Sequence, residues 1–330
     1  MDRENVAENI VIFDWLSFTS KMHTPQELIV ALGLNGIEWQ KTKGANGYRD
    51  RFFSNHISIH YNGHNDMGVW VEMSGQGCRA FETFSAVTWG RLFSFIHENG
   101  LKITRLDVAF DDHTGVLPME RIVMDTICGM FVSKSDYWDV HITSKGTSVQ
   151  IGSSQSKVLI RIYDKAAERK LEQGIHWVRC EIQMRDDRAA YFTENPMPIG
   201  ELFAGVILNY LRYVEEGSDS NRWRWPMTDY WSNLVEDAQA ISLYRSPGME
   251  YNLERCKDFV FNHSGNAVDC LLQIYGVDTF VKMLKERPTA PNPKYDLLVK
   301  NHKLKKQRNT TSPAAAAPES SDCVTNKRGR

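Results

Sequence analysis

The 330-residue sequence has no C-x-x-C cysteine pair and no long apolar run. Its six cysteines are scattered with no C-x-x-C pair, which argues against a disulfide framework and a cysteine zinc site and favours a reducing cytoplasm. The first residues, MDRENVAENIVIFDWLSF, carry two early acids and too short an apolar stretch for a signal peptide. No apolar run approaches the roughly 20 residues of a membrane span. We therefore expect a soluble cytoplasmic protein that does not contact a membrane.

A strong overall charge is also absent, since 39 basic and 41 acidic residues leave a net charge of −2. The charge is unevenly distributed. From Val281 onward the net charge is about +8, so the remainder carries about −10. Any contact of the main body with nucleic acid must therefore use a local basic face.

The order of sequence patterns predicts an α+β fold with a central, mostly antiparallel sheet flanked by helices. Residues 1–195 are rich in alternating β-branched and aromatic segments, and we expect them to form the catalytic domain. Residues 196–290 show helical periodicity and should form a helical C-terminal region packed on that domain. Residues 291–330 are basic and rich in Pro, Ala and Ser, which predicts a largely disordered tail. The sequence shows no internal repeat.

Three predicted strands, ITRLDVAFDD, KVLIRIYDK and HWVRCEIQMR, share one pattern of apolar and polar faces. Side chains two residues apart on a strand face the same way. Each of these strands therefore has one apolar side. The polar sides carry Arg105, Asp107 and Asp111 on the first strand, Arg161, Tyr163 and Lys165 on the second, and Arg179, Glu181, Gln183 and Arg185 on the third.

The ordinary interpretation of this pattern is a sheet with one face in the core and the other in water. If the three strands are neighbours, however, the polar face gathers a particular inventory. Asp107 and Glu181 offer oxygen ligands for Mg²⁺ or Mn²⁺. The arginines offer cations for a phosphate, and Tyr163 offers a hydroxyl nucleophile. Together these groups suit cleavage of a phosphodiester through a covalent protein–DNA bond.

A phenol is a weak nucleophile near neutral pH because its ordinary pKa is about 10. Nearby cations should favour the phenolate of Tyr163. Arg161 and Arg179 can donate forked hydrogen bonds to phosphate oxygens. Attack by Tyr163 would leave a 5′-phosphotyrosine and a free 3′-hydroxyl, and the conserved bond energy would allow the strand to be rejoined.

At these residues the chain resembles the replication initiation factors of rolling-circle plasmids and filamentous phages, and the related relaxases of conjugative elements. The resemblance is carried by DWLSFT, VEMSGQGCRAFE, ITRLDVAFDD, GTSVQIGSSQSKVLIRIYDKAAE and WVRCEIQMR, which cover most of residues 10–190. It implies an enzyme that nicks and closes one strand of a replication origin. It also implies a rolling-circle nuclease fold in the cytoplasm of a bacterial host.

The resemblance implies that Tyr163 is the nucleophile and that Asp107 and Glu181 bind Mg²⁺ or Mn²⁺. Lys165 and Arg179 match the same motifs, and we expect them to be catalytic. The sequence lacks the His-hydrophobic-His metal motif common in rolling-circle nucleases. Its nearest equivalent is HISIH, in which His56 and His60 would lie about 13 Å apart on one strand.

The expected partner is origin DNA, as a single-stranded or cruciform nick site with adjacent duplex. A host helicase, a single-strand binding protein and a polymerase are expected to act with the protein, and a homodimer is an open alternative. Arg105, Arg161 and Arg185 are the predicted DNA contacts on the polar face. In the Gly/Ser-rich segment 146–157, Ser153, Ser154 and Ser156 either hold the DNA backbone or form a plain hairpin turn.

Three other functions are compatible with parts of this pattern. A relaxase for conjugative transfer would use the same chemistry on a different origin. A non-catalytic origin-binding protein would bind the same DNA and form no covalent adduct. A small-molecule enzyme would show a defined apolar pocket and no salt-sensitive binding to DNA.

Overall fold

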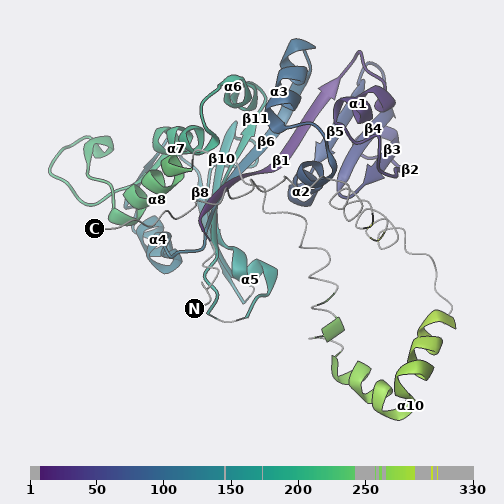
Figure 1. Cartoon of the computed structure of the whole chain (residues 1–330). Helices are drawn as coiled ribbons and strands as arrows, with labels where there is room; N and C mark the ends of the chain where they lie inside the picture. Colours follow the sequence, from purple (N-terminus) through teal and green to yellow (C-terminus); the bar gives the residue numbers. More distant parts are fainter. Residues whose placement is uncertain are drawn as a thin grey trace, which may run out of the picture. The chain divides into compact units, whose positions relative to one another are not determined.

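A computed structural model describes residues 8–144, 146–172, 174–241, 257, 260–261, 265–286, 299 and 303. Its main feature is a ten-stranded sheet with the strand order β2-β3-β4-β5-β1-β6-β11-β10-β9-β8, in which every neighbouring pair is antiparallel (Figure 1). Helices pack against this sheet. The predicted α+β class with a central antiparallel sheet flanked by helices is therefore confirmed.

The chain enters the sheet at its centre with β1, builds the first half of the sheet and returns to pair with β1. An 11-residue strand is followed by a helix and by four consecutive strands, and the last of these pairs with the first strand. The elements are β1 (Ile10–Ser20), α1 (Pro25–Ala31), β2 (Gln40–Lys43), β3 (Tyr48–Ser54), β4 (Ile57–Gly63) and β5 (Val69–Met73). Helices α2 (Gly75–Phe84) and α3 (Trp89–Glu98) follow.

The second half repeats this order, although no repeat is visible in the sequence. Another 11-residue central strand leads to a helix and to four further sheet strands, of which the last again pairs with the first. The elements are β6 (Lys102–Asp112), α4 (Met119–Ile127), β8 (Trp138–Thr143), β9 (Gly146–Ile151), β10 (Val158–Asp164), α5 (Lys165–Arg169) and β11 (Val178–Arg185). Strands β1 and β6 pair at the centre of the sheet and join the two halves.

The remaining described elements follow the sheet in sequence, apart from one short strand. They are α6 (Asp187–Glu194), α7 (Ile199–Tyr210), β12 (Leu211–Tyr213), the 3₁₀ turn η1 (Arg222–Arg224), α8 (Asp229–Ala240) and α10 (Gly265–Glu286). β12 pairs with β7 (Phe131–Ser133) outside the main sheet. Within α10 the backbone is non-helical at Gly276.

The core lies against one face of the sheet. Leu106, Val108 and Phe110 of β6 are fully buried, as the period-two pattern predicts. Helix α7 packs on β1 and β6, and its Phe203 ring lies 6.1 Å from that of Phe110. Helices α2 and α6 pack on neighbouring strands, and α4 packs on β8, β9 and β10. Asp107 and Asp111 of β6, Arg161 of β10, and Arg179 and Glu181 of β11 occupy the alternate positions and therefore lie on the opposite face of the sheet.

Two helices are bounded by local features of the sequence. Segment 79–100 forms the end of α2 and the separate helix α3, which Thr88 caps by accepting a hydrogen bond from the Arg91 amide. Helix α7 ends at Tyr210, and the next three residues form β12.

The proposed division at residues 195 and 290 stays a prediction. The chain separates into one unit that spans Met1–Pro288 and a second that spans Thr289–Arg330. Of the second unit only Val299 and Lys303 are described, so the predicted disordered tail lies almost wholly outside the described residues. None of the described helices combines the length and apolar character that a membrane crossing requires.

Candidate active site

The three strands whose polar faces resemble each other are neighbours in the order β6-β11-β10. Their register places Tyr163 opposite Arg179, and Arg161 opposite Glu181. On the next strand pair, Gln183 is opposite Asp107. Directly opposed residues in an antiparallel pair have their side chains on the same face. The sheet therefore brings the predicted nucleophile and both predicted metal ligands to one place.

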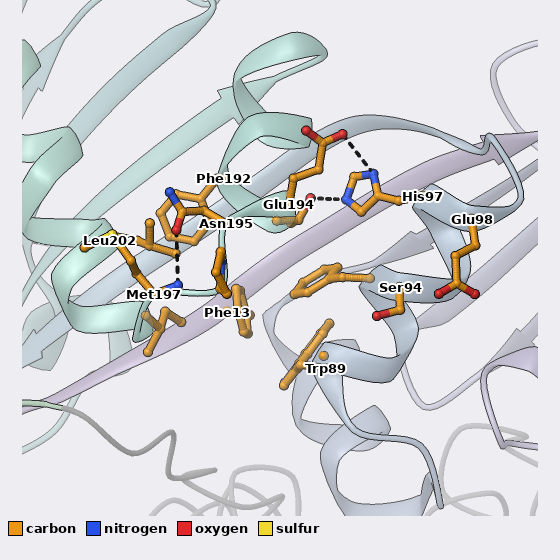
Figure 2. A pocket seen from close by; sticks show the side chains of 15 residues that line it. Phe13, Trp89, Ser94, His97, Glu98, Phe192, Glu194, Asn195, Met197 and Leu202 are labelled. Atoms are coloured by element: carbon orange, nitrogen blue, oxygen red, sulfur yellow. Dashed lines mark hydrogen bonds and ion pairs between the residues drawn. The ribbon is translucent and has the colours of Figure 1, made fainter.

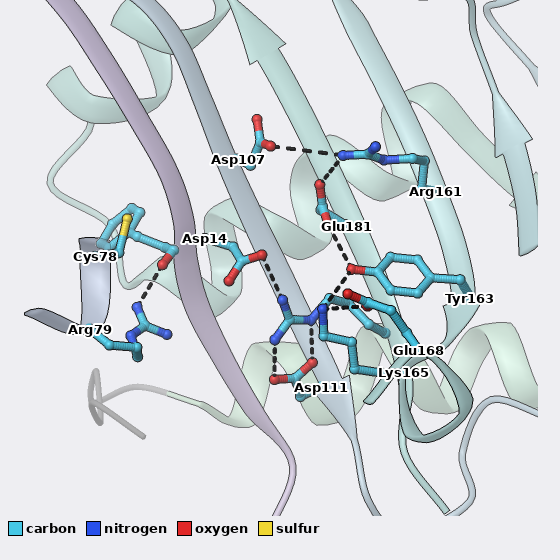
Figure 3. Close-up of polar contacts among 12 residues, drawn as sticks. Asp14, Cys78, Arg79, Asp107, Asp111, Arg161, Tyr163, Lys165, Glu168 and Glu181 are labelled. Carbon is cyan, nitrogen blue, oxygen red and sulfur yellow. Dashed lines mark hydrogen bonds and ion pairs between the residues drawn. The ribbon is translucent and has the colours of Figure 1, made fainter. Parts of the chain in front are cut away.

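Tyr163 lies near the end of β10, and its hydroxyl points to Glu181 (Figure 3). The phenol oxygen donates to Glu181 Oε2 at 3.0 Å. Lys165 Nζ donates to the same phenol oxygen at 3.3 Å and lies 5.2 Å from the centre of the Tyr163 ring. Lys165 is itself paired with Glu168 at 2.6 Å. The hydroxyl thus stands between a carboxylate and an ammonium group.

The expectation that nearby cations would favour the Tyr163 phenolate is not met in this structure. Burial raises the pKa of Tyr163 well above its ordinary value, and the Glu181 carboxylate raises it further. Arg179 acts in the opposite direction but does not compensate. Tyr163 is therefore a neutral hydrogen-bond donor at neutral pH, and its proton must leave as it attacks.

Asp107 and Glu181 are 2% and 4% exposed and face a shared arginine. Arg161 Nη2 forms an ion pair with Glu181 Oε1 and lies 4.0 Å from Asp107 Oδ2. Arg105 donates twice to Asp107. Burial, together with the Glu181 charge, raises the pKa of Asp107 despite these arginines. The Arg161 guanidinium thus supplies the cation between the two acids.

These residues suit a hard divalent cation. Within the described part of the chain, no group of three or more His, Cys, Asp or Glu side chains could hold a metal ion. Mg²⁺, however, usually binds through one or two carboxylates together with water and substrate phosphate, so a pair is sufficient. Asp107 and Glu181 provide two such carboxylates, so their donor type is compatible with Mg²⁺.

All three nitrogens of the Arg179 guanidinium donate hydrogen bonds to two acids, so none of them is placed to bind a phosphate in this structure. Its Nε and Nη2 donate to the carboxylate of Asp111 at 2.6 and 2.7 Å, and its Nη1 donates to Asp14 at 2.6 Å. It is 3% exposed, and Asp111 is 2% exposed. Arg179 therefore orders the end of β11 beside Tyr163. Sequence reasoning missed Asp14, although it belongs to the quoted motif DWLSFT.

The predicted DNA contacts lie at two separate places. Arg161 lines the same cavity as Tyr163, whereas the three serines, Arg105 and Arg185 lie toward the other end of the three strands. Ser153 and Ser156 are hydrogen-bonded to each other in the turn between β9 and β10, and Ser154 belongs to the same turn. This turn precedes β10, whereas Tyr163 is near the strand's other end, so about 23 Å of extended chain separates Ser156 from Tyr163. Arg185 is opposite Arg105 at the turn's end of the face.

A cavity of about 390 Å³ opens at Tyr163, and the β8–β9 hairpin forms its other wall. Tyr163 is opposite Ser148, which is opposite His141, so the three residues form a row across β10, β9 and β8. His141 is paired with Asp139 at 3.1 Å. Sequence reasoning missed His141, and strand alternation on this hairpin was the available signal. The other lining residues are Thr143, Gly146, Thr147, Arg161, Asp164, Glu168 and Glu181.

A larger cavity of about 550 Å³ lies between α3 and the segment from α6 to α7 (Figure 2). Its lining is mostly apolar and includes Phe13, Trp89 and Phe192. In its wall His97 Nδ1 lies 3.4 Å from Glu194 Oε1, and His97 Nε2 is hydrogen-bonded to the Thr193 hydroxyl. An apolar pocket of the type expected for a small-molecule enzyme is thus present. Its lining residues do not include the nucleophile and paired carboxylates that face the cavity at Tyr163.

Both halves of the chain match known protein families. Residues 101–286 match the family described as replication initiation factor, and residues 10–98 match the N-terminal domain of rolling circle replication initiation proteins. These two matches begin close to the first strands of the two halves of the sheet.

Two individual proteins are also similar. "Putative DNA relaxase NicK" of Bacillus subtilis (strain 168) is 29% identical over 233 residues, which cover 64% of this chain and 66% of the relative. The solved structure of a rolling circle replication initiator protein from Geobacillus stearothermophilus is 30% identical. It superposes with a TM-score of 0.65 over 71% of this chain and 97% of the other.

Proposed function

Because this chain belongs to the replication initiation factor family, we propose that it nicks one strand of origin DNA through a 5′-phosphotyrosine at Tyr163. The nick leaves a 3′-hydroxyl that primes rolling-circle replication, and the same enzyme rejoins the strand at termination. The observation that supports this proposal best is the 3.0 Å hydrogen bond from the Tyr163 phenol to Glu181 at the wall of a cavity.

In the proposed reaction, Glu181 Oε2 accepts the phenol proton as the Tyr163 oxygen attacks the phosphorus atom. This route is needed because burial and the Glu181 charge keep Tyr163 protonated beforehand. The distance of 3.0 Å lies within the range for general base catalysis. A bond forms between the Tyr163 oxygen and phosphorus, and the bond from phosphorus to the 3′-oxygen breaks. The departing 3′-oxygen takes up a proton from water and becomes the free 3′-hydroxyl. Rejoining reverses both changes.

Arg161 is the proposed phosphate contact of the cavity. Its guanidinium lines the cavity together with Tyr163 and is 36% exposed, so it can reach a bound strand. Lys165, at 3.3 Å from the phenol oxygen, stabilises negative charge that develops there. Arg179 positions the strand end through Asp111 and Asp14 and does not touch the phosphate.

We further propose that Asp107 and Glu181 hold Mg²⁺ or Mn²⁺. The ion would neutralise charge on the scissile phosphate and polarise its phosphorus atom. Arg161 and Arg105 neutralise these acids in the structure described here. Both arginines would turn to the DNA phosphates when the acids bind the metal, which links metal binding to DNA binding.

The proposed partner is origin DNA with an unpaired nick site. The named activities of the relatives support this choice, since one is a relaxase acting on DNA and the other initiates rolling circle replication. A host helicase, a single-strand binding protein and a polymerase would act on the opened strand. The cytoplasm of a bacterial host is the proposed location.

The function can be tested before the origin sequence is identified. The protein is incubated with Mn²⁺ and a single-stranded library of about 20 random positions, a length that exceeds the site of a single binding fold, and adducts that survive denaturation are recovered. Sequencing both products defines the nick. We expect one enriched sequence with wild-type protein and no adduct with Tyr163→Phe, whose DNA affinity stays close to wild type. An adduct with Tyr163→Phe would remove Tyr163 as the nucleophile.

The similarity to a named DNA relaxase favours one second candidate, conjugative transfer with the same chemistry. A plasmid that carries the selected nick site separates the two functions. Accumulation of single-stranded plasmid in the host supports replication, whereas transfer to recipient cells without such accumulation supports a relaxase. A non-catalytic origin-binding protein would select a sequence but never form the adduct.

A further inference from the structure

The polar face of the sheet beside Tyr163 also carries Trp15 and Gln183, which the proposed reaction does not use. Trp15 of β1 is opposite Asp107 of β6, which is opposite Gln183 of β11. Opposed residues of antiparallel strands face the same way, so Trp15 and Gln183 flank Asp107 on the polar face. One pair further along, Arg105 and Arg185 are opposite each other. This group is continuous with the catalytic carboxylates.

Several hydrogen-bond donors in this group have no acceptor among the described residues. Gln183 is 4% exposed, and its amide nitrogen is unpaired. The indole nitrogen of Trp15 and Nε of Arg185 are likewise buried without a partner in the described part of the chain. Folded proteins pair nearly all buried donors, because an unpaired one loses its bonds to water without replacement. Three such donors on one face indicate a ligand that is rich in acceptors.

Arg105 shows where a planar group fits. The centre of its guanidinium lies 4.3 Å from the centre of the Trp15 ring, and the group also donates to Asp107. Nucleobases stack on aromatic side chains in the same manner. The Arg105 side chain is 23% exposed and lies at the surface of this face. It can therefore leave the indole without opening the apolar core on the other side of the sheet.

We propose that Trp15 and Gln183 form a base-selecting subsite for one unpaired nucleotide of DNA next to the scissile phosphate. The base stacks on Trp15, and its edge is bound by the Gln183 amide. Glutamine presents a donor and an acceptor side by side, which is the pairing that adenine matches. Arg105 turns to a backbone phosphate, and Arg185 supplies a second cation. The subsite depends on the proposed nicking function and adds the source of its sequence preference.

The first experiment compares base preferences in the random-library capture. Wild-type protein should prefer adenine at one position beside the nick, by about 5- to 150-fold over the other bases. Gln183→Leu should form the adduct and lose the preference at that position alone. Gln183→Glu should shift it toward cytosine, whose amino group donates to a carboxylate. Gln150→Leu is the matched control, because the Gln150 amide on the same face is already paired with the Gly152 carbonyl at 3.0 Å.

The second experiment measures stacking on the selected oligonucleotide. Trp15→Leu should weaken binding by about 5- to 150-fold and leave the single-turnover rate at saturating DNA within about 3-fold of wild type. Trp15→Phe retains an aromatic face and should restore most of the affinity. A purely structural role of Trp15 would instead lower the melting temperature in both variants without separating affinity from rate.

The proposal is overturned if Gln183→Leu and Gln183→Glu keep the wild-type preference at every position. It is also overturned if both variants melt like wild type and form no adduct, because Gln183 would then belong to the chemistry. These results are distinct from failure of the proposed function, in which wild-type protein itself forms no adduct at Tyr163.

Discussion

Replacing Asp111 by asparagine should destabilise the protein strongly, because it removes the main partner of a buried cation. Arg179 donates twice to Asp111, at 2.6 and 2.7 Å, and only once to Asp14. Both members of the Arg179–Asp111 pair are nearly inaccessible. Removing one partner of a buried ion pair costs about 3–5 kcal/mol, since the remaining charge stays buried. That is a large part of the roughly 5–15 kcal/mol that stabilises a typical domain.

The matched variant is Asp14→Asn, which removes the weaker partner of the same guanidinium. The Asp14 side chain is 19% exposed and accepts one bond, so we expect a loss of about 1–3 kcal/mol. Urea unfolding followed by circular dichroism gives the free energy of unfolding for both variants. A cost below about 1 kcal/mol for Asp111→Asn would show that this ion pair does not stabilise the fold as argued. Equal costs for the two variants would show that Asp111 is not the main partner of Arg179.

Three further predictions concern pH, helix packing and metal dependence. Burial lowers the pKa of His60 to about 4. Between about pH 6.5 and 4 the unfolded chain therefore binds a proton that the folded protein does not. The free energy of unfolding should fall by up to about 3 kcal/mol as the pH is lowered through this range. His60→Phe should remove that part of the acid sensitivity in urea titrations at about pH 7 and about pH 4.5, on either side of the ordinary histidine pKa, and equal losses in both proteins would contradict the assignment. Gly200→Ala should lower the melting temperature, because a Cβ atom there would lie 1.9 Å from the Ala238 carbonyl oxygen of α8. Gly205→Ala in the same helix meets open space and should raise the free energy of unfolding by about 0.5–1 kcal/mol. Asp107→Asn should raise the Mn²⁺ concentration for half-maximal adduct yield by at least about 10-fold, and an unchanged titration would exclude this residue as a ligand.

The strand alternation in the sequence is sufficient to predict the faces of β6, β10 and β11. Leu106, Val108 and Phe110 are spaced by two and line the apolar core, which leaves Asp107 on the opposite, polar face of the sheet. The alternation does not predict which strands pair when they are distant in the sequence. The sequence therefore left open whether the three strands are neighbours, and the β6-β11-β10 order shows that they are.

Other parts of the site could not be predicted because they depend on tertiary contacts. The pairing of β1 with β6 is irregular between Phe13 and Trp15, and Asp14 at this irregularity contacts Arg179, which is 165 residues away. The raised pKa of Tyr163 results from burial, which no local pattern reveals. Ser153 and Ser156 were predicted as DNA contacts from the Gly/Ser-rich composition of their segment. The strand β10 lies between their turn and Tyr163, which is near its far end.

Covalent joining of the Tyr163 oxygen to the 5′-phosphate of nicked DNA is the step on which the proposed function depends. It can be observed by mass spectrometry of the adduct after digestion with nuclease and protease. We expect a nucleotide phosphate on the peptide that contains Tyr163, located by fragmentation to that side chain. A phosphate linked to another residue, such as the exposed Tyr191, or an adduct peptide without Tyr163, would contradict the proposed chemistry.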